Sequence, residues 1–175
     1  MFNLPKLIGH RGVKNLSPEN TLESIKLAKN LGLKWIEIDV KISKDCTPIL
    51  LHDNTLDRTT NGCGFPTKYN YEQLKKLDAG FFFYNRPTNI HIPTLKQVLF
   101  YCKKNKIGLN IEIKPNIGFE KKTVDSIIKL FKEFEFSNNI FFSSFDWNLI
   151  ILMKNLIPNF YYGLLIDKFS EKINI

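Results

Sequence analysis

The sequence has few cysteines and no long apolar run. Its 175 residues include only Cys46, Cys63 and Cys102, and no CxxC spacing, which favours reduced thiols over a disulfide framework or a zinc site. No stretch reaches the roughly 20 consecutive apolar residues of a membrane-spanning helix. The first residues also lack the apolar segment of a secretory signal. We therefore expect a cytoplasmic protein without stable membrane insertion.

Arginine is scarce as well, supplying only three of the 25 basic residues against 17 acidic ones, for a formal charge of +8. Proteins that read nucleic acids rely on arginine for its rigid bidentate fork. The lysines are spread along the chain, and no zinc-finger, RNA-recognition or helix-turn-helix signature is present. These features argue against a nucleic-acid partner. An electropositive rim that attracts an anionic substrate fits the charge better.

The order of the predicted elements indicates a single α/β domain. Six strands are predicted, at residues 6–10, 35–40, 48–52, 108–114, 139–145 and 160–166. Helices are predicted from Ser17 as N-cap to residue 31, and near 71–77, 94–105, 119–135 and 147–156. Strands that alternate with helices of 10–15 residues favour a parallel sheet. Residues 53–93, rich in glycine and proline, interrupt this alternation, and an interruption of that length is usually functional.

Polar residues stand near the ends of strands that should be apolar if buried. Glu37 and Asp39 are two residues apart and share one face of a strand, as do Glu112 and Lys114 on another. His10 and His52 each end an apolar strand. Parallel α/β folds build their sites at the carboxyl ends of strands, so we expect these side chains to meet there.

Such a set suits metal-assisted cleavage of a phosphoryl ester. Three neighbouring carboxylates need a cation, and oxygen ligands favour Mg²⁺ or Ca²⁺ over zinc. Two histidines supply an acid and a base near neutral pH, and Arg11 with Lys114 can bind phosphate. The alternatives are structural: a solvent-facing edge strand, a Glu112–Lys114 ion pair and buried structural histidines. We expect Glu19 and Asn20 to be helix-start residues, and Phe81 to Tyr84 either to line the mouth or to pack the insertion.

The motifs together resemble those of the glycerophosphodiester phosphodiesterase family. The resemblance spans residues 7 to about 166 and rests on His10-Arg11-Gly12, Pro18-Glu19-Asn20-Thr21, Glu37-Ile38-Asp39-Val40, His52-Asp53, Leu56 to Gly62, Leu77 to Gly80, Ile92 to Leu95, Asn110 to Lys114 and Ser143 to Phe145.

This resemblance implies an α/β fold, a TIM-type (β/α) barrel, with about six of eight strands present and the C-terminal part incomplete. It implies one domain over residues 1–175, with the insertion 53–93 over the active-site mouth. The implied reaction is metal-dependent hydrolysis of glycerophosphodiesters, a small-molecule substrate, to an alcohol and sn-glycerol 3-phosphate. The implied roles are catalysis by His10 and His52, substrate binding by Arg11 and Lys114, and binding of one divalent cation, Mg²⁺ or Ca²⁺, by Glu37, Asp39 and Glu112.

The resemblance also implies that the glycerol hydroxyl of the substrate attacks the phosphorus and that water then opens a cyclic phosphate. The sequence leaves open which histidine is the acid, the headgroup preference, the choice of metal and the oligomeric state. Two alternatives remain: an inactive truncated remnant or binding module of the same fold, and a related barrel phospholipase acting on membrane lipids. The Asp57-Arg58-Thr59-Thr60 run within the insertion favours the glycerophosphodiesterase over the phospholipase.

Overall fold

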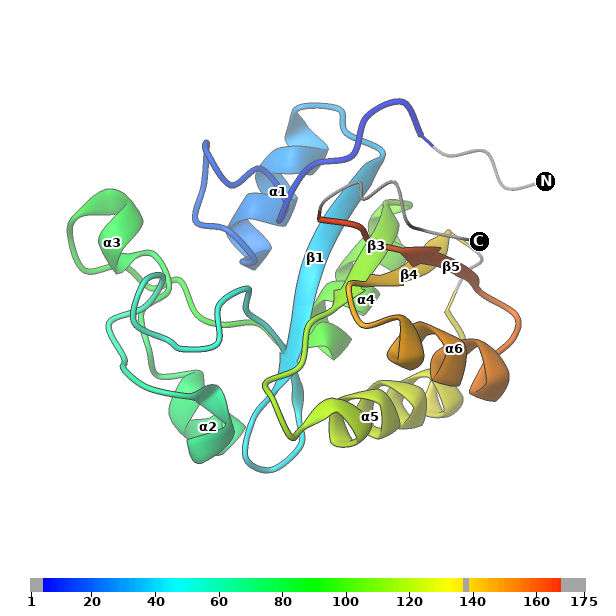
Figure 1. Ribbon diagram of the computed structural model, residues 1–175. Coiled ribbons are helices and arrows are strands. Elements are labelled where there is room, and N and C mark those ends of the chain that lie inside the picture. Colours follow the sequence, from blue (N-terminus) through cyan, green and yellow to red (C-terminus); the bar gives the residue numbers. More distant parts are fainter. Residues whose placement is uncertain (1–4, 137–138, 168–175) are drawn as a thin grey trace.

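A computed structural model describes residues 5–136 and 139–167 of the chain (Figure 1). The strands are β1 (Trp35–Ile42), β2 (Pro48–Leu50), β3 (Gly108–Ile113), β4 (Ile140–Ser144) and β5 (Tyr161–Leu164). The helices are α1 (Leu22–Asn30), α2 (Tyr71–Leu74), α3 (Phe81–Tyr84), α4 (Leu95–Asn105), α5 (Glu120–Glu133) and α6 (Trp147–Leu156), with a 3-10 turn at Pro66–Lys68. Among the described residues, none of these helices combines the length and apolar character that a membrane crossing requires.

The strands form one open sheet in the order β2-β1-β3-β4-β5. β1, β3, β4 and β5 are parallel, as the alternation of strands and helices predicts, whereas β2 returns antiparallel to β1 after a tight turn. The predicted first strand at 6–10 is wrong. Only an isolated bridge joins Gly9 to Ile36, because the chain turns away at Arg11 and Gly12, whose φ angles are 52° and 81°.

The predicted helices at 94–105, 119–135 and 147–156 agree with α4, α5 and α6. Thr94 caps α4, since its hydroxyl accepts a hydrogen bond from the Gln97 amide at 3.1 Å. The predicted start of the first helix at Ser17 is wrong. The N-cap of α1 is Thr21, and Asn20 before it has a φ of 55°, which a helix cannot continue through.

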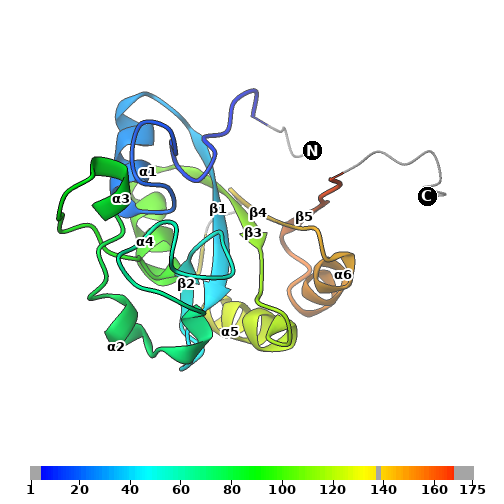
Figure 2. The ribbon, with the colours of Figure 1, turned by 60° about the vertical axis from the view of Figure 1, so that its left-hand side comes forward.

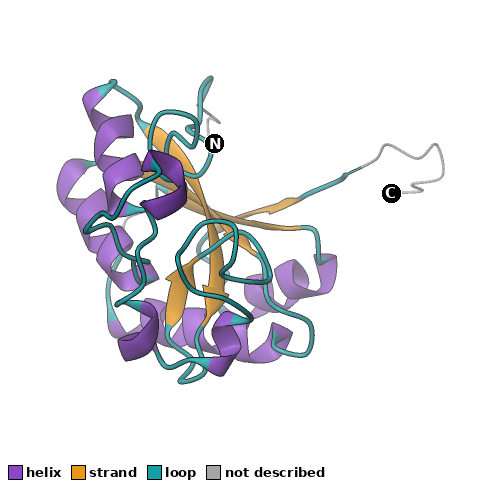
Figure 3. Ribbon diagram, turned by 90° about the vertical axis from the view of Figure 1, so that its left-hand side faces the viewer, coloured by secondary structure: helices purple, strands orange, loops and turns teal. Residues whose placement is uncertain are grey.

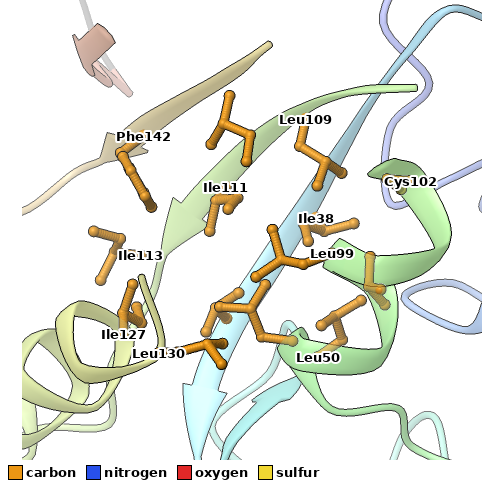
Figure 4. Close-up of a cluster of buried hydrophobic side chains, with 14 of the residues drawn as sticks. Ile38, Leu50, Leu99, Cys102, Leu109, Ile111, Ile113, Ile127, Leu130 and Phe142 are labelled. Atoms are coloured by element: carbon orange, nitrogen blue, oxygen red, sulfur yellow. The ribbon is translucent and has the colours of Figure 1, made fainter. Parts of the chain in front are cut away.

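One face of the sheet carries the hydrophobic core. Ile38, Ile111 and Phe142 point from successive strands toward α4 and α5, as Figure 4 shows. Side chains such as Leu99 of α4 and Ile127 of α5 complete this layer, and all of them are nearly inaccessible to solvent. Because strand side chains alternate between faces, the apolar residues of β1 and β3 fix which residues point the other way.

The other face of the sheet is polar and also buried. Glu37, Asp39 and Lys41 alternate with the core residues of β1, and Asn110 and Glu112 do the same on β3. The insertion, with α2 and α3, lies on the side of β1 away from α6 in Figures 1 and 2. It is mostly loop, as Figure 3 shows, and has its own small apolar cluster. The fold therefore buries a polar layer next to a loop-rich segment.

The aromatic packing of β4 gives a test of this core. Phe142 is fully buried, and its ring centroid lies 5.2 Å from that of Phe131 and 5.5 Å from that of Phe160. We expect Phe142→Ala to lower the free energy of unfolding by about 3–5 kcal/mol, because it removes these contacts and leaves a cavity. Phe82→Ala, at a side chain that is 53% exposed, should change it by about 0.5 kcal/mol or less. Urea denaturation measures both; equal losses would contradict the assigned core.

Candidate active site

Three buried carboxylates meet on the polar face of the sheet. One ligand oxygen from each of Glu37, Asp39 and Glu112 lies within 4.8 Å of the other two. The strand register causes this meeting, because Asp39 is paired with Glu112 across β1 and β3. Glu37 lies two residues earlier on the same face of β1. The structure thus brings together the three residues that the sequence predicts as metal ligands.

Arg11 reaches this cluster from the turn that follows the bridge at Gly9. Its backbone amide donates to Glu37 Oε2 at 2.8 Å, and its Nε lies 3.3 Å from Asp39 Oδ2. The turn requires glycine at position 12, where φ is 81° and a Cβ would overlap the Ser24 side chain. This backbone shape directs both the amide and the guanidinium of Arg11 at the carboxylates.

Lys114 and His52 form the opposite side of the site. The Lys114 ammonium lies 3.2 Å from Glu112 Oε1, 3.7 Å from Asp39 Oδ1 and 2.8 Å from His52 Nε2. His52 Nδ1 lies 2.6 Å from Asp53 Oδ1. A lysine ammonium can only donate and an ionised carboxylate can only accept, so His52 carries its proton on Nδ1 and has a lone pair on Nε2.

His10 stands beside the cluster and is about half exposed. Its Nε2 lies 3.9 Å from Glu37 Oε2. Burial lowers the pKa of His10 below 6.5, and the charges of Arg11 and Lys14 lower it further. All seven residues predicted for the site therefore lie around one group of carboxylates.

Three residues of the site were missed or misjudged from the sequence. Glu19, predicted as a helix-start residue, lies two positions before the N-cap of α1 and accepts a hydrogen bond from Arg11 Nη1 at 2.8 Å. Asn20 is not a helix-start residue: its amide donates to Asp39 Oδ2 at 2.8 Å, and its carbonyl oxygen accepts from the Asp39 amide at 3.1 Å. Lys41 is fully buried on the same face as Glu37 and Asp39, and it donates to the Lys114 carbonyl at 2.7 Å. Burial lowers the pKa of Lys41 to about 8. Its spacing of two residues from Asp39 was a signal that could have placed it here.

The carboxylates have the properties of a cation site. Burial, and then the charge of Asp39, raises the pKa of Glu37 to about 8. Glu37 Oε1 and Asp39 Oδ1 are buried and accept no hydrogen bond from the described part of the chain. Buried oxygens without donors and an all-carboxylate ligand set fit a hard divalent cation such as Mg²⁺ or Ca²⁺.

Two surface recesses have walls that include residues of the insertion. One has a volume of about 450 Å³ and is lined by Asn54, Phe65, Asn116 and Ile117 among others. The other, of about 180 Å³, has Glu19, Arg58, Phe82 and Phe83 in its wall. Asn54 and Asn116 each follow a site residue, His52 or Lys114, by two positions. The insertion therefore contributes to the wall of both recesses, and Phe82 and Phe83 line the smaller one.

Comparison with known proteins gives consistent matches. Residues 10–174 match the profile of the glycerophosphoryl diester phosphodiesterase family. The chain is 38% identical over 159 residues to a glycerophosphodiester phosphodiesterase of Caldanaerobacter subterraneus, covering 91% of this chain and 65% of that protein. It is 33% identical over 150 residues to human glycerophosphodiester phosphodiesterase 1, covering 84% of this chain and 44% of that protein.

A solved structure shows the same fold. A phosphodiesterase from Oleispira antarctica, in complex with the product sn-glycerol-3-phosphate, matches with a TM-score of 0.90 at 36% identity, over 97% of this chain and 69% of that chain. This match confirms the predicted fold class, an α/β fold of the TIM-barrel type, although the sheet of the described residues is open. The chain spans just under two thirds of the length of the Caldanaerobacter relative.

The raised pKa of Glu37 predicts how stability depends on pH without metal. The unfolded chain releases this proton near pH 4.5, whereas the folded protein holds it to about pH 8. The free energy of unfolding in EDTA should therefore fall between those values, by an amount on the order of a few kcal/mol. Glu37→Gln should flatten this fall when the two proteins are compared by urea denaturation at each pH.

Both proteins contain His10, so the comparison removes its contribution to the pH dependence. That contribution has the opposite sign: because the pKa of His10 is lowered in the folded protein, the free energy of unfolding that it supplies rises as the pH rises toward 6.5. A divalent cation should reverse the fall in the wild-type protein, since it binds the deprotonated carboxylates. If the free energies of unfolding of the wild type and of Glu37→Gln changed with pH in parallel, the raised pKa would not belong to Glu37.

Proposed function

The chain belongs to the glycerophosphoryl diester phosphodiesterase family, and we propose that it hydrolyses glycerophosphodiesters to an alcohol and sn-glycerol 3-phosphate with the help of one divalent cation. The observation that carries this proposal is the carboxylate cluster of Glu37, Asp39 and Glu112, whose oxygens lie within 4.8 Å of one another. Cationic groups of Arg11 and Lys114 lie beside it. Carboxylates for a metal next to cations for a phosphate are the parts that this reaction needs.

Glu37, Asp39 and Glu112 would hold the cation, either Mg²⁺ or Ca²⁺. When bound, such an ion polarises a phosphoryl oxygen and offsets the charge that develops during displacement. Arg11 and Lys114 would bind the other phosphate oxygens from two sides of the cluster. Asn20 would keep Asp39 in place through its two hydrogen bonds.

The histidines would move the protons. In the first step, the glycerol hydroxyl of the substrate attacks the phosphorus and the bond to the leaving alcohol breaks. His52 accepts the proton of the hydroxyl at Nε2, whose lone pair is released from its contact with Lys114 when the ammonium binds the phosphate. His10 donates a proton to the leaving alcohol, and its lowered pKa makes it a stronger acid when protonated.

The second step would reverse these roles. Water attacks the cyclic phosphate and the bond to the glycerol oxygen that attacked first breaks, which leaves glycerol 3-phosphate. The histidine that lost its proton accepts one from water, and the other returns its proton to the glycerol oxygen. Both histidines end in their starting states, so the chain's own groups balance the proton transfers.

The insertion 53–93 would shape the substrate pocket. It contributes Phe65 to the larger recess and Phe82 and Phe83 to the smaller one. A glycerophosphodiester would place part of its structure in one of these recesses. The product complex of the Oleispira phosphodiesterase supports this substrate class. The cytoplasmic location and the absence of a nucleic-acid partner stay predictions.

Metal dependence tests the function directly. Purified protein should release glycerol 3-phosphate from glycerophosphocholine with Mg²⁺ or Ca²⁺ and stop in excess EDTA. Glu37→Gln should lower the rate to the level of the chelated wild type, because it removes one carboxylate of the cluster. Glu133→Gln, at an exposed glutamate of α5, is the matched control and should leave the rate unchanged.

A wild-type rate that survives chelation would contradict the metal assignment. A folded wild-type protein with no turnover would favour a binding module, and cleavage of phospholipid vesicles in place of the soluble diester would favour the phospholipase alternative.

Substitution of the proposed base gives a second test. His52→Asn should lower kcat by about 100- to 10,000-fold, the usual contribution of a positioned acid or base. His91→Asn should have no effect, because His91 is exposed and its Nδ1 lies 3.4 Å from the Leu77 carbonyl, outside the group of residues around the carboxylates. Glycerol 3-phosphate release at saturating substrate measures both, and a His52→Asn protein of normal kcat would exclude His52 as the base.

A further inference from the structure

Arg58, in the insertion, is the side chain that joins this segment to both sides of the site. Its Nη1 and Nη2 donate to the two oxygens of Glu19 at 3.0 and 2.7 Å. Its Nε and Nη2 donate to the two oxygens of Asp53 at 2.5 and 3.0 Å. One guanidinium therefore holds two carboxylates, each through two hydrogen bonds, in the fork geometry that only arginine provides.

Each of these carboxylates has a second partner in the site. Glu19 Oε1 accepts from Arg11 Nη1 at 2.8 Å, and Asp53 Oδ1 lies 2.6 Å from His52 Nδ1. The contacts thus form a continuous network that runs from Arg11 through Glu19, Arg58 and Asp53 to His52. This network joins the turn before α1, the end of β2 and the insertion, segments that are distant in the sequence.

Arg58 also keeps both carboxylates ionised. Hydrogen bonds from Arg58 are the main cause that lowers the pKa of Asp53 well below its usual range. Burial on its own would raise the pKa of Glu19, but hydrogen bonds from Arg58 and Arg11 outweigh burial and lower it. An ionised Asp53 accepts only, which is what keeps the proton of His52 on Nδ1.

We propose that Arg58 is a positioning residue that acts through Asp53 and Glu19: it holds His52 in the Nδ1–H form, with Nε2 free to accept a proton, and holds the guanidinium of Arg11 at the carboxylates. This inference deepens the proposed function and rests on it for the role of His52. Arg58 itself lies outside the carboxylate cluster, and its four hydrogen bonds reach the site only through the two acids. Its expected contribution is to kcat, since it orients groups that are already present.

Two variants separate the contribution of the four hydrogen bonds of Arg58 from that of its positive charge. Arg58→Met removes all four hydrogen bonds, and Arg58→Lys keeps a positive charge that can reach only one carboxylate well. We expect kcat to fall about 10- to 100-fold in Arg58→Met, the size typical for loss of a group that orients a site residue, and less in Arg58→Lys. Arg86→Met, at the exposed second arginine of the insertion, is the matched control and should keep the wild-type kcat.

A double-mutant cycle tests the route of the effect. If Arg58 acts on His52 through Asp53, Arg58→Met should lower kcat much less when it is added to Asp53→Asn than when it is made alone. Full additivity of the two losses would overturn the proposed route through Asp53.

Nitrogen NMR of the imidazoles gives a readout that needs no turnover. The chain has only three histidines, so ¹⁵N-labelled His52 can be assigned with His91 as an internal reference. His52 should be the Nδ1–H tautomer in the wild type and in Arg86→Met, and a mixture of tautomers in Arg58→Met. An unchanged His52 tautomer in an Arg58→Met protein whose His91 signals match the wild type, and which is therefore folded, would overturn the proposal.

The two proposals fail in different ways. If the wild type hydrolyses no glycerophosphodiester, the proposed function fails, while the tautomer change in Arg58→Met still shows whether Arg58 positions His52. If the wild type is active but the His52 tautomer does not respond to Arg58→Met, only the positioning role fails.

Discussion

The burial of three carboxylates on one sheet face is the constraint on which the rest of the structure depends. Like charges this close repel, and burial removes the water that would screen them, so the group is stable only with compensating charge or bound protons. Burial and the charge of Asp39 raise the pKa of Glu37, although the Arg11 amide and guanidinium lower it in part. Arg11 and Lys114 each contact more than one member of the cluster, and a divalent cation would supply the remainder.

The alternation of side chains along the strands produces this charged layer on one face of the sheet and the hydrophobic core on the other. Ile36, Ile38 and Val40 point toward the helices, so the residues between them must face the opposite way. The apolar face stabilises the parallel strands, and their register then sets Asp39 beside Glu112. Packing on one side of the sheet therefore fixes the spacing of the charges on the other, because a shift of one residue would exchange the two faces.

Much of this arrangement could be predicted from the sequence, because period-two spacing reports the face of a strand and parallel strands place their carboxyl ends together. Those two rules are enough to group the three carboxylates. What could not be predicted depends on unusual backbone and on contacts between distant segments. Asn20 reaches Asp39 only through a left-handed turn, which its motif does not distinguish from a helix start. The strand expected at 6–10 ends after one bridge for a related reason: the chain turns at Arg11, and that turn aims the Arg11 amide at Glu37.

The insertion is best understood as part of the site's framework and not as a cover alone. Besides the aromatic side chains that it contributes to the recesses, this segment supplies an arginine that binds two carboxylates, Asp53 beside His52 and Glu19 beside Arg11. Long loops with little regular structure are ordered by such specific contacts, because they have few backbone ladders to fix them. Ordering of the insertion and alignment of Arg11 and His52 would then be one event, since both depend on the same guanidinium. Because Arg58 shares the wall of the smaller recess with Phe82 and Phe83, the proposed contacts of these rings with substrate would act on the same guanidinium that aligns Arg11 and His52.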